Sequence, residues 1–182
     1  MIYCRSTQVL SVKPRSDQET LRIMNPLVTN CLASVQYGKQ ILADVDDAQM
    51  AERPMGLNPP AWLLMHLATA ADYAAVLLSG KGVCPADWNE RADTKKPVSS
   101  NRADYPSKDE LMKYFDSSYQ NAADLLKNAS AQQLAAPQKL GFFENELPTV
   151  ADMAGFLLVA HLTIHLGQIS AWRRATGKSP LF

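Results

Sequence analysis

Apolar side chains recur at steps of three and four residues along four separate stretches of this sequence, and that spacing restricts the fold more than any other feature. Such steps place the apolar side chains on one face of an α-helix. The first stretch covers residues 25–45. No stretch shows a convincing alternation of apolar and polar residues, which is the period typical of strands. The sequence therefore predicts an all-α fold.

Start and stop signals delimit three further helices, which we expect at residues 58–80, 107–129 and 149–175. Asn58 can cap the second helix, and the proline that follows it suits a first helical position. The third and fourth helices each begin with Ser or Thr followed three residues later by an acidic residue, which is the spacing of a capping box. Four amphipathic helices without strands favour a four-helix bundle.

The polar segment 80–106 between the second and third helices is much longer than the loops that join antiparallel neighbours. Travelling back along a helix of roughly 30 Å takes at least ~9 extended residues, so this segment can cross from one end of a bundle to the other. The two helices are therefore expected to run parallel, which gives an up-down-down-up order. Trp88 in this segment could cover one bundle end as a lid, or the segment could be a solvated crossover without a functional role.

Length and charge exclude several classes of protein. The 182 residues suffice for one domain, with the bundle at 25–182 and residues 1–24 as an arm of unknown placement. The 18 basic side chains are balanced by 18 acidic ones, so the chain lacks the basic surface typical of nucleic-acid binding. We expect no membrane span and no signal peptide, and three widely spaced cysteines favour a reducing compartment. The prediction is a cytoplasmic protein that binds neither nucleic acid nor membranes.

All three histidines lie on helix faces that are expected to turn inward. His161 and His165 are four residues apart on the last helix, so their rings project from one face and can share a metal ion. His66 lies midway along the second helix among apolar residues and can supply a third ligand. Three imidazoles with an open fourth position resemble the plan of catalytic zinc sites, and imidazole also suits iron, nickel and copper. The sequence predicts a divalent-metal site but does not choose the metal.

A structural interpretation competes with this one. A histidine on an apolar helix face is more often a hydrogen-bonded core residue than a ligand, and a HxxxH pair alone is a weak signal. The balance favours a metal because burying three unpaired titratable rings is costly and ligation gives them a common role. Leu162 stands where the zinc-protease motif HExxH carries its glutamate, which excludes that class.

Two motifs surround these histidines. One is NPPAWLLMHLA at 58–68, in which Trp62 lies four residues before His66; the other is HLTIHLGQI at 161–169, followed by two arginines and a glycine. Both motifs, with the order of helices and crossover from about residue 25 onward, resemble the DinB-like superfamily of small helical metalloproteins. The resemblance implies an up-down-down-up bundle, usually dimeric, with a divalent metal held by the residues that here are His66, His161 and His165.

Characterised relatives of that superfamily include transferases and isomerases that use a low-molecular-weight thiol such as bacillithiol, mycothiol or glutathione, and membership does not fix the activity. We therefore expect a metal-dependent thiol S-transferase or hydrolase that acts on a small molecule, with zinc, nickel or iron as the metal and a thiol as a candidate co-substrate. A homodimer is expected as well. The alternatives are a non-catalytic metal- or ligand-binding stress protein and a structural bundle in which the histidines only hydrogen-bond.

Other side chains are candidates for roles around the rings. Gln168 could touch the ligand shell, and Thr69 could hydrogen-bond an imidazole or a bound water. Arg173 and Arg174 could meet an anionic thiol, although cations in a last helical turn are ordinarily explained by the helix dipole. The candidates for lining a pocket, for which plain core packing is the simpler account, are Trp62, Tyr73 and Trp172.

The loop before the last helix adds two acidic and two aromatic candidates. The sequence does not fix whether the carboxylate of Glu144 or Glu146 approaches the metal. The Phe142–Phe143 pair could reach the mouth of the pocket or a partner subunit, and ordinary packing is the simpler interpretation.

Overall fold

The computed structural model describes residues 17–181, and their side chains from Pro26 onward. Within that range the regular structure is helical, apart from one isolated β-bridge between Pro137 and Thr149. The predicted all-α class is therefore confirmed. The long helices are α1 (Asp17–Ile41), α2 (Pro60–Leu77), α4 (Lys108–Asn128) and a last helix that runs on through α6 (Val150–Gly155), a π-helical segment (Phe156–His161) and α7 (Leu162–Ala175).

Short helices interrupt the connections between the long ones. They are 3-10 helices at Asp47–Ala51, Pro54–Gly56 and Arg102–Asp104, and the short α-helices α3 (Trp88–Arg91) and α5 (Ala131–Ala135).

Two of the predicted helix starts are capped as the sequence indicates. The Ser107 hydroxyl accepts a hydrogen bond from the backbone N–H of Glu110, which begins α4. Thr149 accepts one from the N–H of Asp152, whose carboxylate accepts from the Thr149 N–H in return, so a full capping box begins α6.

The first helix differs from the prediction at both ends. It begins at Asp17, eight residues before position 25, and the exposed Pro26 lies inside it. The residues before position 25 are mostly polar and show no clear apolar spacing, which is why the sequence pattern predicted a later start. The helix ends at Ile41; Val45 is buried beyond that end, because the chain turns back over the core. The rest of the predicted N-terminal arm, residues 1–16, lies outside the described residues.

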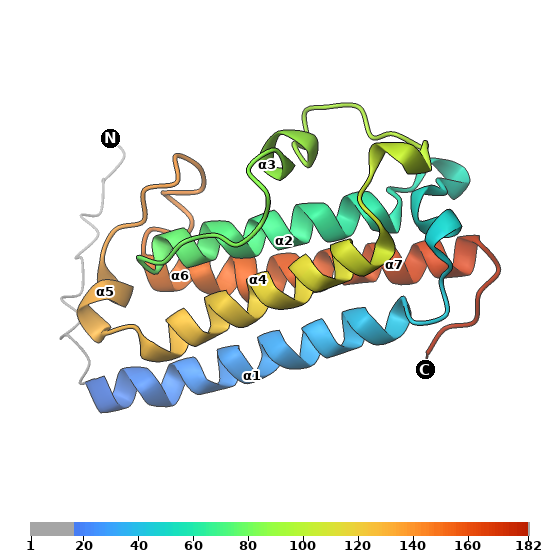
Figure 1. The fold of residues 1–182 in the computed structure, drawn as a ribbon. Helices are drawn as coiled ribbons and strands as arrows, with labels where there is room; N and C mark the ends of the chain where they lie inside the picture. The colour runs from blue at the N-terminus through green and yellow to red at the C-terminus, as the bar shows by residue number, and fades with distance from the viewer. Residues whose placement is uncertain (1–16, 182) are drawn as a thin grey trace, which may run out of the picture.

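The four long helices lie side by side in Figure 1, and α2 contacts both α4 and the last helix. Thirteen of the 18 residues of α2 are buried, so this helix is covered on nearly all sides rather than on one face. Its sequence accommodates this because it is rich in Ala and Leu and has no Lys, Arg or Glu. His66 thus lies on the most enclosed helix of the described chain.

The crossover between α2 and α4 packs against the protein instead of lying free in solvent. Trp88 in α3 is 1% exposed and its ring meets the ring of Tyr114 edge-on, with centroids 5.0 Å apart. Ala92, directly after α3, is also buried. Figure 1 shows α3 over the middle of α2, so this part of the segment is packed against the bundle and does not lie over one bundle end, where a lid was considered.

The last helix is long and apolar. By length and composition alone, Val150–Ala175 could cross a membrane: its most apolar window has a mean hydropathy of 1.5, and 39% of that window is buried. The absence of a membrane span stays a prediction. A core helix of a soluble protein has the same character, and the contacts of this helix with α1 and α2 agree with that second interpretation.

Candidate metal centre

The three imidazole rings meet between α2 and the last helix. Nε2 of His161 lies 3.1 Å from Nε2 of His66 and 3.1 Å from Nε2 of His165. Ligand atoms of the three rings all lie within 4.8 Å of one another, and in the described part of the chain no carboxylate or thiol joins this group. The structure thus brings together the three residues that the sequence singles out, in an arrangement that could hold a metal ion.

A π-helical turn places His161. In the segment Phe156–His161 the helix is widened, so that residues five apart lie one above the other. The rings of Phe156 and His161 are accordingly 5.8 Å apart, whereas residues five apart in an α-helix point about 140° away from each other. Apolar spacing predicts an uninterrupted α-helix here, because Leu158 and Leu162 satisfy the four-residue step by themselves. Turns of this kind are frequent at functional sites.

Hydrogen bonds fix the protonation of two of the rings. Nδ1 of His66 lies 3.2 Å from the carbonyl oxygen of Ala92, which can only accept, so Nδ1 carries the proton and donates it. Nδ1 of His165 lies 3.3 Å from Oε1 of Gln168, which also can only accept, so this Nδ1 carries the proton as well. Both neutral rings therefore present an unprotonated Nε2 to the centre. This is the state of a histidine ligand, whose other nitrogen typically donates to a carbonyl or carboxylate oxygen.

The third ring makes the site fit a cation. His161 can direct at most one Nε2 proton toward two acceptors, the Nε2 atoms of His66 and His165, and its own Nδ1 is buried without a hydrogen-bond partner. At least two lone pairs are therefore left without a donor in any neutral arrangement of the three rings. A cation among the three Nε2 atoms would satisfy all of the lone pairs at once.

Burial keeps the rings neutral. Desolvation lowers the pKa of His66 from 6.5 to about 4, with the nearby His165 adding to the effect. Desolvation lowers the pKa of His161 to about 3, with both other rings contributing, and it lowers the pKa of His165 as well. Trp62 stacks on His66 with ring planes 7° apart and centroids 4.9 Å apart, which covers one face of that imidazole. Near neutral pH, therefore, all three rings are free of a second proton.

The supporting candidates divide clearly. Gln168 lies beside His165 and Trp62 beside His66, as expected. The Thr69 hydroxyl donates to the backbone carbonyl of His66 at 2.9 Å and not to a ring, and its contact with a bound water stays a prediction. Tyr73, a candidate for lining the pocket, has 40% of its surface exposed to solvent and is not a core residue. Trp172 is fully buried and its indole N–H donates to the Glu52 carbonyl at 2.7 Å, which is core packing.

Neither arginine of the last turn is available as a simple anion contact at the rings. Arg173 is 4% exposed and donates to the Ile41 carbonyl at 2.7 Å, to the Ser179 carbonyl at 2.9 Å and to the Asp44 carboxylate. It ties the end of α7 to the end of α1, which neither the helix-dipole account nor the thiol account predicts. Arg174 is exposed and donates to the Ser170 hydroxyl.

The loop before α6 contributes rings and not carboxylates. Glu144 accepts from the backbone N–H of Gly141 within the loop, and Glu146 is exposed. The rings of Phe143 and Phe156 are 5.9 Å apart, and Phe156 in turn lies beside His161. Phe156 is a neighbour of the centre that helical spacing did not reveal, since the π-turn is what brings it there.

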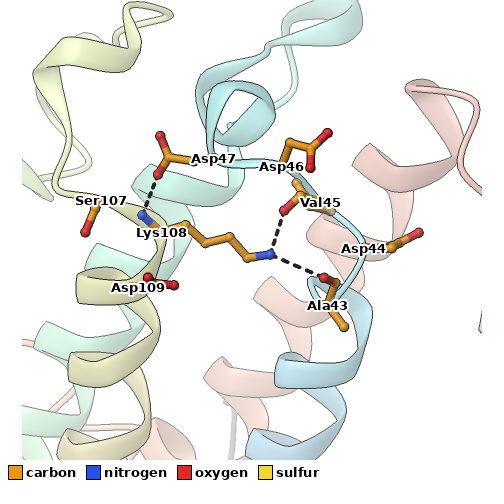
Figure 2. Close-up of a pocket in the computed structure, with 8 residues that line it drawn as sticks. All are labelled: Ala43, Asp44, Val45, Asp46, Asp47, Ser107, Lys108 and Asp109. Carbon is orange, nitrogen blue, oxygen red and sulfur yellow. Dashed lines mark hydrogen bonds between the residues drawn. The ribbon is translucent and has the colours of Figure 1, made fainter.

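A second concave surface lies where α1 ends and α4 begins. Figure 2 shows Lys108 at its centre: the amine donates to the carbonyls of Ala43 and Val45, and the backbone N–H donates to the Asp47 carboxylate. Arg102 also binds Asp47 and is the main cause of the lowered pKa of that carboxyl. These contacts connect the segment after α1 to the start of α4, so the polar residues of this surface have a structural role and indicate no binding site.

In the described residues the long elements are helices, and all three histidines of the chain converge from two of them. The protein is therefore a helical protein with a candidate three-histidine metal centre. A family model of the DinB superfamily matches residues 38–169, which include all three histidines. Because that match spans most of the chain, the protein belongs to the DinB superfamily. No curated protein matches the sequence closely enough to narrow this further.

Proposed function

We propose that this protein is a metal-dependent enzyme of thiol S-transfer or hydrolytic type that acts on a small molecule, with zinc, nickel or iron held by His66, His161 and His165. The observation that carries the proposal is the approach of three Nε2 atoms, with Nδ1 of His66 and Nδ1 of His165 each facing an oxygen acceptor. A purely structural trio of histidines would not leave a buried lone pair without a donor.

A divalent metal at such a site lowers the pKa of a water or thiol that binds it, which supplies a nucleophile near neutral pH. The protein's own residues supply position and desolvation. The Ala92 carbonyl and the Gln168 side chain fix the ring orientations of His66 and His165. Trp62 and Phe156 cover ring surfaces and exclude water from them.

The remaining expectations stay proposals of the same kind. The order up-down-down-up agrees with the advance of colour along the four long helices in Figure 1 and with the long crossover over α2. A cytoplasmic location without nucleic-acid or membrane partners agrees with the balanced charge, and a homodimer is proposed from the resemblance to the superfamily. A thiol such as bacillithiol, mycothiol or glutathione is the proposed co-substrate.

Metal content tests the site. Protein made without a histidine tag and without chelator should contain about one divalent metal per chain by elemental analysis, in keeping with one cluster of ligands. Re-adding metal to the stripped protein should raise its melting temperature, because a ligand that binds only the folded state stabilises it. His161→Ala should lose both effects, whereas Thr69→Ser, a change near but not in the centre, should keep them. A metal-free wild type whose stability ignores added metal would refute the site and leave the structural interpretation.

Turnover separates an enzyme from a binding protein. The metal-loaded protein should be assayed with several thiols paired with electrophiles, and with ester and amide substrates in the absence of thiol. Activity that disappears in His161→Ala supports the proposal. Bound metal without turnover across that panel would favour a non-catalytic metal- or ligand-binding protein.

A further inference from the structure

The loop between α5 and α6 presents two large aromatic side chains to solvent. Phe142 is 40% exposed and Phe143 is 51% exposed. Phe143 has a φ of +54°, in the left-handed region that bulky residues rarely adopt. Backbone strain of this kind persists only where surrounding contacts enforce it. The display of these two rings therefore needs a structural cause.

The cause is a buried clamp beneath the loop. Gln138 is 3% exposed; its side-chain N–H donates to the Phe142 carbonyl at 2.9 Å, and its Oε1 accepts from the Leu140 N–H at 2.8 Å. The Phe143 carbonyl accepts from the Leu147 N–H at 2.8 Å. The backbone at both phenylalanines is thus held by hydrogen bonds, which keeps the two rings on the same side of the loop as the contacts below require.

The exposed rings continue inward to the candidate metal centre. Centroids of Phe142 and Phe143 are 5.8 Å apart, those of Phe143 and Phe156 are 5.9 Å apart, and those of Phe156 and His161 are 5.8 Å apart. Each pair lies within the spacing at which aromatic rings interact favourably. The result is a continuous row of rings that begins at the surface and ends on a histidine of the centre.

We propose that Phe142, Phe143 and Phe156 form an apolar wall that binds an uncharged aromatic group of the small molecule whose polar group reaches the metal centre. This inference rests on the proposed function and names the substrate class of that same site. The loop carries one exposed cation, Lys139, and two exposed anions, Glu144 and Glu146, so it offers no excess of positive charge to an anionic group. Flat rings in an edge-to-face row offer an aromatic group further contacts of the same kind.

Two metal-binding probes that differ only in their apolar part test the wall. Zinc-loaded protein should be titrated calorimetrically with acetohydroxamate and with benzohydroxamate. We expect the aromatic probe to bind ~10-fold tighter, since burying one more apolar group against these rings is worth roughly that much. In the double variant Phe142→Ala/Phe143→Ala the two affinities should become about equal, while zinc affinity is unchanged. Met55→Ala, which removes an 87% exposed side chain elsewhere, should keep the preference.

A second measurement does not need the metal. Benzyl alcohol added to the metal-free protein should shift the ring resonances of Phe142 and Phe143 in spectra of protein with labelled phenylalanine, assigned by single Phe→Leu variants. A preference for benzohydroxamate that survives in the double variant, or rings that do not respond to benzyl alcohol, would overturn the wall. Ring shifts in a chain that binds no zinc would uphold the wall and reject the proposed function. A wild-type dimer that the double variant converts to a monomer would assign the rings to a subunit interface instead.

Discussion

His161 is the side chain on which the proposed centre depends most, because its Nε2 lies 3.1 Å from the Nε2 of each of the other two rings. The other two histidines each have an oxygen beside Nδ1, whereas Nδ1 of His161 is buried without a partner. Its orientation therefore comes from packing, with the ring of Phe156 beside it through the π-turn. Hydrogen bonds at Nδ1 therefore orient His66 and His165, whereas the packing of neighbouring side chains orients His161.

The lowered pKa values make the stability of the metal-free protein depend on pH. Between pH 6.5 and about 4, His66 binds a proton in the unfolded chain but not in the folded one, so the unfolded state gains protons first. The free energy of unfolding should fall as pH falls through that window, by at most about 1.4 kcal/mol per pH unit for each such ring. Urea unfolding of chelator-treated protein at pH 7, 6 and 5 measures it.

The matched variants for this experiment are His66→Gln and His161→Gln, which remove one titrating ring each. Each should show a shallower loss of stability toward pH 5 than the wild type does, since the carboxylates titrate equally in all three proteins. Parallel slopes for wild type and variants would mean that the rings titrate normally in the folded state.

Arg173 should matter for stability and not for metal. Replacing it with Leu leaves the carbonyls of Ile41 and Ser179 without their donor, and we expect a loss of about 2–4 kcal/mol, as for a buried charged hydrogen-bond network. Asp44→Asn removes a partner whose side chain is 58% exposed and should cost about 1 kcal/mol or less. Denaturant unfolding compares the two variants, and unchanged zinc content is the control. Equal losses in both would mean that the ion pair, and not the carbonyl contacts, carries the effect.

At the scale of elements, α2 and the last helix do most to define the site. Helix α2 is enclosed by α4, the last helix and α3, so His66 is fixed from several sides. The crossover between α2 and α4 also contributes a hydrogen-bond acceptor, because the Ala92 carbonyl directly after α3 accepts from Nδ1–H of His66. Trp88, buried against Tyr114, anchors that carbonyl at its place over α2. A connection between helices thus becomes part of the candidate centre.

The cap of α4 allows a clean test of an element in isolation from the site. Ser107→Ala removes the acceptor for the Glu110 N–H and should lower the free energy of unfolding by about 1 kcal/mol, with a range of roughly 0.5–2. Ser117→Ala in the body of the same helix should change it by less than about 0.5 kcal/mol, because alanine favours helices. Denaturant unfolding of both, with zinc content as a check, distinguishes them. A cost for Ser117→Ala as large as that for Ser107→Ala would contradict the capping role.

At the scale of the whole molecule, the outer face between α1 and α7 is the surface that best suits the proposed homodimer. A groove there is lined by small and uncharged residues, with one arginine among them, and the neighbouring Ile164 is 56% exposed on the apolar last helix. The lining residues are Asn30, Ala33, Ser34, Tyr37, Thr163, Leu166, Gly167, Ser170 and Arg174.

Gly167 offers a substitution that disturbs this surface and not the fold, since a Cβ added there meets no atom within 4 Å. We expect the wild type to be a dimer by light scattering in detergent-free buffer, with twice the chain mass of 20.0 kDa. Gly167→Glu should shift it to monomer, because it places a charged and much larger side chain in the proposed interface. Val76→Glu, at an exposed position on α2, should not. A wild type that stays at 20.0 kDa at all concentrations would remove the dimer proposal.

The sequence by itself determined the helical class, the caps at Ser107 and Thr149, and the three residues that converge, because apolar spacing and start signals are local properties that one chain segment carries alone. It also indicated Gln168, which lies one turn from His165 on the same face. The predicted start of α1 was wrong by eight residues, because the polar residues from Asp17 onward carry no apolar spacing that would mark them as helical.

Only the tertiary structure decided what each ring faces. The Ala92 carbonyl on Nδ1 of His66 comes from 26 residues away in the chain, and no local spacing encodes that contact. The row from Phe142 to His161 depends on a buried clamp at Gln138 and a π-turn, and both arise where packing overrides the regular helix. The sequence shows Arg173 only as a cation in the last turn of a helix. In the structure it donates to the carbonyl of Ile41 and so connects the end of α7 to the end of α1. Local periodicity selects which residues turn inward, whereas the partners they meet are set by how the helices pack.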